Sequence, residues 1–137
     1  MLDHLAIEVA DVDTSTEFYL EVLAPIGIAI STRLEFEGDV TVGLSGPSGL
    51  ASFWLNPAQS LETREVHIAF RAKDLETVDA VYKAALKAGK EVIHAPREYP
   101  EYHPGYYAVF IRDPDGHSVE AVFHGRPNAS LDEVQEY

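Results

Sequence analysis

The sequence predicts an α+β protein made of two tandem βαβββ modules. Each half of the 137-residue chain opens with period-two hydrophobicity, continues with helical spacing and ends with three strand-like segments. The halves also match when one is shifted by 63 positions, the separation of His4 and His67. Such a repeat indicates a duplicated supersecondary unit. We expect one domain over residues 1–124, with modules at 1–56 and 64–124 and a polar tail at 125–137.

The first module begins with an alternating strand over residues 3–9. Helical spacing follows over residues 11–24, with Asp11 or Asp13 as the N-cap. Glycine-containing turns then separate three predicted strands, which cover residues 28–37, 39–45 and 50–55. A polar linker over residues 56–63 leads to the second module.

The second module repeats this order. His67 falls on the position of His4, and Asp74 falls on that of Asp11. Its helix has a clear apolar stripe, formed by Leu75, Val78, Val81, Tyr82, Ala85 and Leu86. Strands are predicted near residues 91–95, 106–112 and 117–123. A type I turn, Asp113-Pro114-Asp115-Gly116, joins the last two strands.

Composition limits the partners and the chemistry. The net charge of −13 should repel nucleic acid phosphates and anionic lipids, so we expect neither nucleic-acid nor membrane partners. The chain has no cysteine, and a metal site would therefore use His, Asp or Glu. We find no apolar run of about 18 residues and no signal-peptide pattern. A cytoplasmic location is the expectation that remains.

Three side chains are candidate metal ligands: His4, His67 and Glu120. Each lies on the strand face opposite the one that should pack against the helices. If the two sheets curl together, two imidazoles and one carboxylate converge and form a facial triad with open positions for substrate. The alternative is that the histidines form ordinary hydrogen bonds and the glutamate faces solvent. Spacing alone leaves both interpretations open.

The span from Leu2 to His124 resembles the vicinal oxygen chelate superfamily, the group of glyoxalases, bleomycin resistance proteins and extradiol dioxygenases. The resemblance rests on four motifs: Leu2-Asp3-His4, Thr16-Glu17-Phe18-Tyr19, Val66-His67-Ile68-Ala69-Phe70, and Asp113-Pro114-Asp115-Gly116 followed by His117-Ser118-Val119-Glu120. It implies an open, cup-shaped mixed sheet with helices outside. It also implies that His4, His67 and Glu120 bind a divalent ion (Fe, Mn, Ni, Co or Zn), that the substrate is a small molecule, and that the chain forms a homodimer.

The chain departs from glyoxalase-type members at one point. Their fourth ligand is a glutamate on the fourth strand of the first module, whereas that strand here is Ala51-Ser52-Phe53-Trp54-Leu55 and has no carboxylate. Trp54 is expected at or near that position. The resemblance therefore favours the three-ligand dioxygenase and fosfomycin-resistance members over a true lactoylglutathione lyase, although we identify no basic residues in the sequence arranged for a phosphonate.

The segment from Arg97 to Tyr107 is rich in aromatic residues with polar ends, which suit the rim of a small-molecule pocket. We assign candidate catalytic roles to His103, Tyr106 and Tyr107, and substrate contacts to Trp54, Arg97 and Tyr102. The alternative is a proline-ordered loop whose tyrosines pack on the sheet. Glu8 and Arg71 are equivalent in the repeat, and either an ion pair or separate pocket contacts would fit them.

The resemblance, together with the three candidate ligands, implies a metal-dependent enzyme with lyase, isomerase or dioxygenase chemistry. The substrate would bind through two oxygens, and the metal would stabilise an enolate or alkoxide. The alternative is a non-enzymatic protein of the bleomycin-resistance type that sequesters a ligand.

Overall fold

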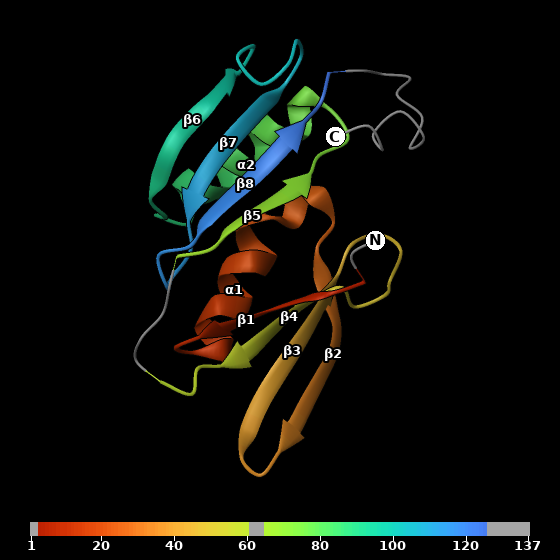
Figure 1. Ribbon diagram of the computed structural model, residues 1–137, viewed down its shortest axis with the longest axis vertical. Helices are drawn as coiled ribbons and strands as arrows, with labels where there is room; N and C mark the ends of the chain where they lie inside the picture. Colours follow the sequence, from red (N-terminus) through yellow and green to blue (C-terminus); the bar gives the residue numbers. More distant parts are fainter. Residues whose placement is uncertain (1–2, 61–64, 126–137) are drawn as a thin grey trace.

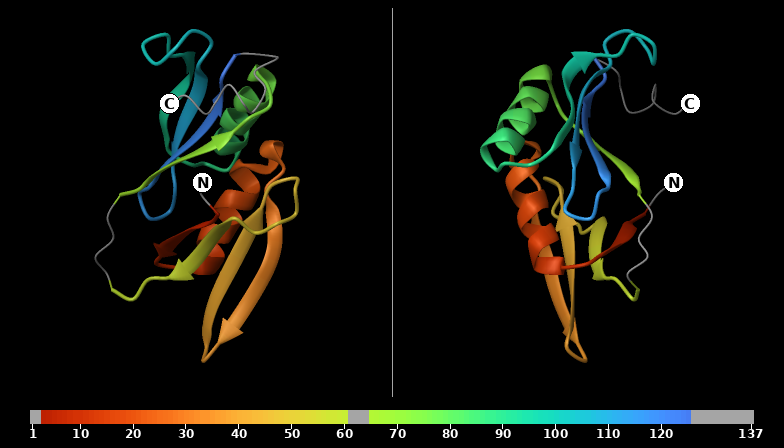
Figure 2. Two further views of the ribbon diagram at one scale, coloured as in Figure 1. Left: turned by 45° about the vertical axis from the view of Figure 1, so that its right-hand side comes forward. Right: turned by 90° about the vertical axis from the view of Figure 1, so that its left-hand side faces the viewer.

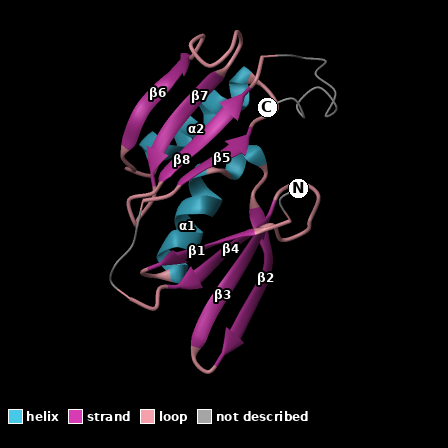
Figure 3. Cartoon of the chain, viewed as in Figure 1, coloured by secondary structure: helices cyan, strands magenta, loops and turns pink. Residues whose placement is uncertain are grey.

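A computed structural model describes residues 3–60 and 65–125, so the predicted tail at 125–137 lies almost entirely outside the described residues. Two modules of the same order are seen (Figures 1 and 3). The first contains β1 (Leu5–Val9), α1 (Val12–Val22), the short helix η1 (Ala24–Ile26), β2 (Ala29–Phe36), β3 (Asp39–Ser45) and β4 (Phe53–Pro57). The second contains β5 (His67–Arg71), α2 (Leu75–Lys87), β6 (Val92–Glu98), β7 (Tyr107–Arg112) and β8 (Ser118–Phe123).

Each module forms its own four-stranded mixed sheet. The strand orders are β1-β4-β3-β2 and β5-β8-β7-β6, so the two modules have the same topology. In each sheet the first strand pairs in parallel with the last strand of its module, and the other pairs are antiparallel. The predicted α+β fold of two βαβββ modules is therefore confirmed.

Two strands extend further than the sequence predicts. Strand β4 reaches Pro57, and β6 reaches Glu98. Pairing explains both extensions, because Pro57 lies opposite Val9 of β1 and Glu98 lies opposite Tyr107 of β7. Proline and charged residues at strand ends give little local β signal, so tertiary pairing decides these boundaries.

The helix caps repeat with the modules. The side chain of Asp11 accepts a hydrogen bond from the Thr14 amide at 2.7 Å, and Asp74 accepts one from the Thr77 amide at 2.8 Å. Asp11, and not Asp13, is therefore the N-cap of α1. Because N-capping satisfies an amide that the helix leaves without a partner, both helices begin at the same point after their strands.

The helices lie on the same side of the two sheets, and no described helix covers the opposite faces, which we call the open faces (Figure 2). One apolar core runs under both modules. Where the modules meet, the ring of Tyr19 on α1 lies 5.0 Å from Phe53 of β4, and Phe53 lies 5.4 Å from Phe70 of β5. No described helix is long and apolar enough to cross a membrane.

The turn between β7 and β8 joins the two modules. The Oδ1 atom of Asp115 accepts a hydrogen bond from the Ala10 amide at 2.8 Å, beside the start of α1. Asp113 Oδ2 accepts one from the hydroxyl of Tyr19 at 2.9 Å. Burial, and then the Asp113 carboxylate, raises the pKa of Tyr19, so this hydroxyl keeps its proton. Two carboxylates of module two are thus fixed on the helix of module one.

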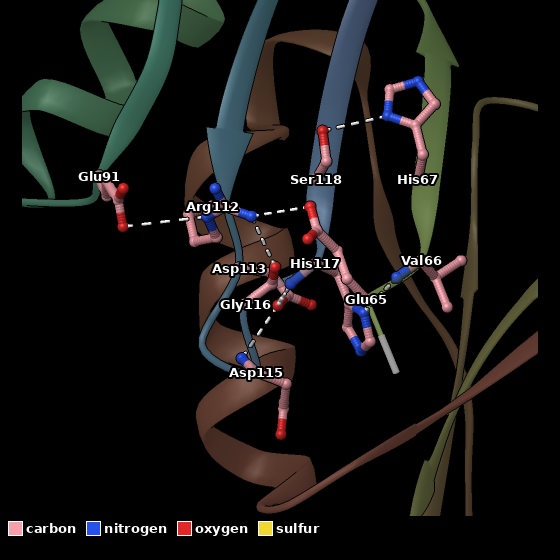
Figure 4. A network of polar contacts seen from close by, with 10 residues as sticks. All are labelled: Glu65, Val66, His67, Glu91, Arg112, Asp113, Asp115, Gly116, His117 and Ser118. Carbon is pink, nitrogen blue, oxygen red and sulfur yellow. Dashed lines mark hydrogen bonds and ion pairs between the residues drawn. The ribbon is translucent and has the colours of Figure 1, made fainter. Parts of the chain in front are cut away.

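The same turn also orients the approach to β5 (Figure 4). Asp113 Oδ1 accepts hydrogen bonds from the amides of Asp115 and His117 at 2.9 and 2.8 Å. His117 is buried, and its Nδ1 accepts a hydrogen bond from the Val66 amide at 2.9 Å. The residue before His67 is therefore held against the start of β8.

We expect Asp113→Ala to lower the free energy of unfolding by about 3 kcal/mol, because it leaves a buried tyrosine hydroxyl and two amides without their acceptor. Urea denaturation measures this. Tyr19→Phe removes only one of the three donors and should cost about 1 kcal/mol. Asp39→Ala, at an exposed strand end, is the matched control and should change the value by less than about 0.5 kcal/mol. Equal losses for all three variants would contradict the role of the turn.

Candidate functional site

The centre of the site is a contact between His67 and Glu120 on the open face of the second sheet. In the parallel pair β5–β8, His67 lies opposite Ser118, and Ala69 lies opposite Glu120. Paired residues point to the same side of a sheet, so these side chains share the open face. His67 Nε2 lies 2.8 Å from Glu120 Oε2, and His67 Nδ1 lies 3.0 Å from Ser118 Oγ (Figure 4 shows His67 and Ser118).

Glu120 is a buried carboxylate, with only 2% of its surface exposed. Its second oxygen, Oε1, accepts a hydrogen bond from the hydroxyl of Tyr106. Burial, and then this bond, raises the pKa of Tyr106. Within residues 3–60 and 65–125 no lysine or arginine pairs with Glu120. A buried carboxylate held only by an imidazole and a phenol is well suited to a further cationic partner.

A cavity of about 400 Å³ opens over this contact and is lined by His67, Tyr102, Tyr106, Phe110 and Glu120. Phe110 lies directly opposite Glu120 across the β7–β8 pair. Its ring is 5.8 Å from His67 and 5.7 Å from His94. The cavity therefore combines two potential metal ligands with aromatic walls.

Three tyrosines build one wall of the cavity region. The rings of Tyr99 and Tyr102 stack at 5.5 Å, and the rings of Tyr102 and Tyr106 meet edge to face at 5.0 Å. Tyr99 is buried, and its hydroxyl has no hydrogen-bond partner among the described residues. Tyr102 and Tyr106, both predicted site residues, line the cavity, and the ring of Tyr99 packs against both of them.

Two other predicted residues lie outside the cavity. Tyr107 follows Tyr106 directly and so points to the other face of the sheet, where its hydroxyl donates to Asp79 of α2 at 2.7 Å. Burial, and then this bond, raises the pKa of Tyr107 to about 12. Arg97 lies over the ring of Tyr99 at 3.6 Å and pairs with Glu101 at 2.8 Å. Strand alternation thus separates Tyr107 from the site, and Arg97 supports the tyrosine wall from outside.

His103 lies beyond Tyr106 and forms a pair with His124. His103 Nε2 and His124 Nδ1 are 2.9 Å apart, and the two rings stack at 5.2 Å. Both rings meet Tyr106 edge to face, at 5.3 and 5.2 Å. From the sequence we predict a site role for His103 but none for His124, because His124 follows the end of the predicted strand 117–123.

The first module presents Trp54 where the second presents Glu120. Ala6 of β1 lies opposite Trp54 of β4, as Ala69 lies opposite Glu120. The indole of Trp54 packs over Gly43 of the neighbouring strand β3. A Cβ atom added to Gly43 would lie only 2.9 Å from this ring. Trp54 therefore has the register position in the first sheet that Glu120 has in the second, and its place near a fourth ligand stays a prediction.

His4 does not join His67 and Glu120 within one chain. Its Nδ1 contacts Asp3 Oδ1 at 2.6 Å, and its side chain is 58% exposed. His4 precedes β1, which starts on the side of the molecule where β5 ends, whereas His67 begins β5 (Figure 1). Among the residues that the structure describes, no three His, Asp or Glu side chains are grouped so as to hold a metal ion.

The sequence profile of the Glyoxalase/Bleomycin resistance protein/Dioxygenase superfamily matches residues 1–121. The chain belongs to this superfamily. No curated protein sequence matches it.

Solved structures share the fold. A glyoxylase/bleomycin resistance protein/dioxygenase domain from Frankia sp. EAN1pec is 21% identical, with 93% of each chain covered and a TM-score of 0.73. Lactoylglutathione lyase from Agrobacterium tumefaciens is 24% identical, with 89% of this chain and 92% of that chain covered and a TM-score of 0.66. The fosfomycin resistance protein FosX from Listeria monocytogenes, solved with Mn(II) and sulfate, is 20% identical, with 98% and 96% covered and a TM-score of 0.67.

We expect His124 to lose its proton at a lower pH than the ordinary value of 6.5, because burial first, and then the neighbouring His103 and Arg71, lower its pKa. His103→Gln should raise the pKa of His124 partway and leave it below 6.5, since burial remains. NMR titration of the imidazole protons measures both. An His124 pKa at or above 6.5 in the unsubstituted protein would contradict this environment.

Proposed function

We propose that this protein is a metal-dependent enzyme of its superfamily that acts on a small molecule, with lyase, isomerase or dioxygenase chemistry. The observation that supports it most directly is the pairing of His67 with the buried Glu120 at the cavity. One imidazole nitrogen and one carboxylate are ligands that Fe, Mn, Ni, Co and Zn ions accept. The superfamily includes metal-dependent enzymes, and the FosX structure contains Mn(II).

The third ligand of the proposed site is His4 of a second copy. In one chain His4 is exposed and far along the molecule from the start of β5, and no described helix or strand covers the open faces of the two sheets (Figures 1 and 2). Pairing the first sheet of one copy with the second sheet of another would cover both faces. It would also complete the two-histidine, one-carboxylate set predicted from the sequence, and it accounts for the expected homodimer.

The chain's own residues have distinct tasks in this site. Glu120 and His67 would hold the ion, and a bound divalent metal supplies a Lewis acid for substrate oxygens that gain negative charge. Tyr106 keeps its proton at Glu120 Oε1, which fixes the orientation of that carboxylate. Tyr102 and Phe110 line the cavity and would orient a flat or apolar part of the substrate. His103 lies behind Tyr106 and is proposed to act through it.

True lactoylglutathione lyase activity is not part of this proposal. Trp54 occupies the register position that Glu120 has in the other module, so no carboxylate of the first sheet would face the ion there. An indole can form a wall of the site but cannot accept a proton. A reaction in which the metal ion has only three protein ligands fits this arrangement better.

With the proposed metal site, we expect the protein to bind about one divalent ion per chain. His67→Ala and Glu120→Ala should abolish metal binding, because each removes a ligand. Tyr106→Phe should weaken binding about tenfold, because it removes only the group that orients Glu120. Elemental analysis and metal titration measure these effects. His94→Ala, a histidine against Phe110 in the same sheet, is the control and should bind metal normally.

The shared site is tested with mixed dimers of His4→Ala and His67→Ala chains. Each variant alone should bind no metal. In the mixed dimer one site has both substitutions and the other has neither, so one ion per dimer should return. If His4, His67 and Glu120 of the same chain formed the site, the mixed dimer would bind none. That result, or full metal binding by His4→Ala alone, would refute the assignment.

The second candidate is a protein that sequesters a ligand without catalysis. One observation favours it: both oxygens of Glu120 already have a partner, and the cavity around it is aromatic. A cationic aromatic molecule could bind there through the carboxylate and the rings. A thermal-shift screen distinguishes the two, because stabilisation by divalent metals supports the enzyme, whereas stabilisation by cationic aromatics alone supports sequestration.

A further inference from the structure

A second group of polar side chains lies on the open face of the second sheet, beyond the metal ligands. It consists of Arg71 at the end of β5, His124 just after β8, and His103 from the loop between β6 and β7. Arg71 lies opposite Val122, and His124 is the next residue on the same face of that strand. Three groups that can carry positive charge therefore gather at one end of the sheet, in a chain whose net charge is −13.

Arg71 differs from the other arginines that the structure describes. Arg33, Arg97 and Arg112 each pair with a carboxylate at 2.8 Å. Arg71 is exposed and forms no ion pair within residues 3–60 and 65–125, not even with Glu8, its counterpart in the repeat. In an acidic chain, a guanidinium left without such a partner is available to an external anion.

The histidine pair can adapt to an anion by taking up one proton. His103 Nδ1 lies 2.9 Å from the carbonyl oxygen of Pro104, so this nitrogen is the protonated one. When the pair is neutral, His124 Nδ1 must then donate to His103 Nε2. When a proton is added, His103 becomes the donor and the proton of His124 moves to Nε2. The far side of His124 thereby becomes a donor for a ligand beside Arg71.

The backbone fixes this pair in place. Gly105 and Gly125 pass so closely that a Cβ atom on Gly125 would come within 2.7 Å of the carbonyl carbon of Gly105. Only glycine allows this approach between the loop after β6 and the end of β8. The contact brings His103 against His124 before any ligand arrives, which lowers the entropic cost of binding.

A path along β5 connects this group with the metal ligands. His67, Ala69 and Arg71 all lie on the open face, and Ala69 between the other two has only a methyl group. At about 3.3 Å per residue, Arg71 begins about 13 Å from His67, and its long side chain can reach back over Ala69. Tyr106 bounds the path, since it touches Glu120 at one end and His124 at the other.

We propose that Arg71, His103 and His124 form a binding site for an oxyanion, a carboxylate or phosphate group of the substrate. The guanidinium would bind two oxygens of the anion, and His124 would donate a further hydrogen bond. The identification of this anion as part of the substrate rests on the proposed function. The anion site itself does not, because it uses none of the metal ligands.

The test is titration of the metal-free protein with sodium phosphate and, separately, with sodium acetate, followed by NMR of the histidine ring protons. We expect saturable shifts at His103 and His124. Arg71→Ala should weaken binding about tenfold or more, and Arg71→Lys should restore part of it, because lysine keeps the charge but not the fork. Tighter binding of phosphate would identify a phosphate group, and tighter binding of acetate would identify a carboxylate.

Arg33→Ala is the matched control, since it makes the same change in net charge on the first module and should leave anion binding unaltered. Equal weakening by Arg33→Ala and Arg71→Ala, or no saturable shift with either anion, would overturn the proposal. Metal titration of Arg71→Ala separates the two hypotheses. If Arg71→Ala binds metal normally but no longer binds the anion, both sites are supported. If the unsubstituted protein binds the anion but takes up no metal, only the proposed function is refuted.

Discussion

The hydrogen bonds of Asp113 and Asp115 hold the structure in the form that the site requires. These two carboxylates belong to module two, but they bind the start and the middle of α1 in module one. The same turn fixes His117, and through it the residue that precedes β5. The parallel register of β5 and β8, which brings His67 to Glu120, therefore begins from this turn. Both the packing of the modules and the geometry of the site depend on it.

Much of the fold could be predicted because local signals repeat. Caps at Asp11 and Asp74, alternating strands and a recurring histidine appear twice at one spacing, and both modules have the topology that the repeat predicts. Strand parity also placed His67 and Glu120 on one face. The same parity separates Tyr106 from Tyr107, a distinction that composition of the aromatic segment alone does not make.

Other features of the site depend on contacts between distant residues and carry no local signal. The pairing of His103 with His124, and the place of Arg71 beside them, follow from a loop that folds back onto the end of β8. The position of His4 depends on how the modules are packed, which the sequence pattern does not define. Phe110 could have been found from strand alternation, since it shares the parity of Tyr106 and lies opposite Glu120. The sequence indicates which faces matter, and the tertiary structure determines which side chains meet there.

The equivalence of Trp54 and Glu120 has a consequence for symmetry. Two copies of one ancestral module would form a site with two interchangeable halves, and a substrate could enter it in either of two orientations. Here one half has an acid and the other has an indole at the same register position. In the dimer proposed above, a ligand between the first sheet of one copy and the second sheet of the other would meet the indole of Trp54 on one side and the carboxylate of Glu120 on the other. The divergence of a single strand position would thus give the proposed shared site two unlike sides.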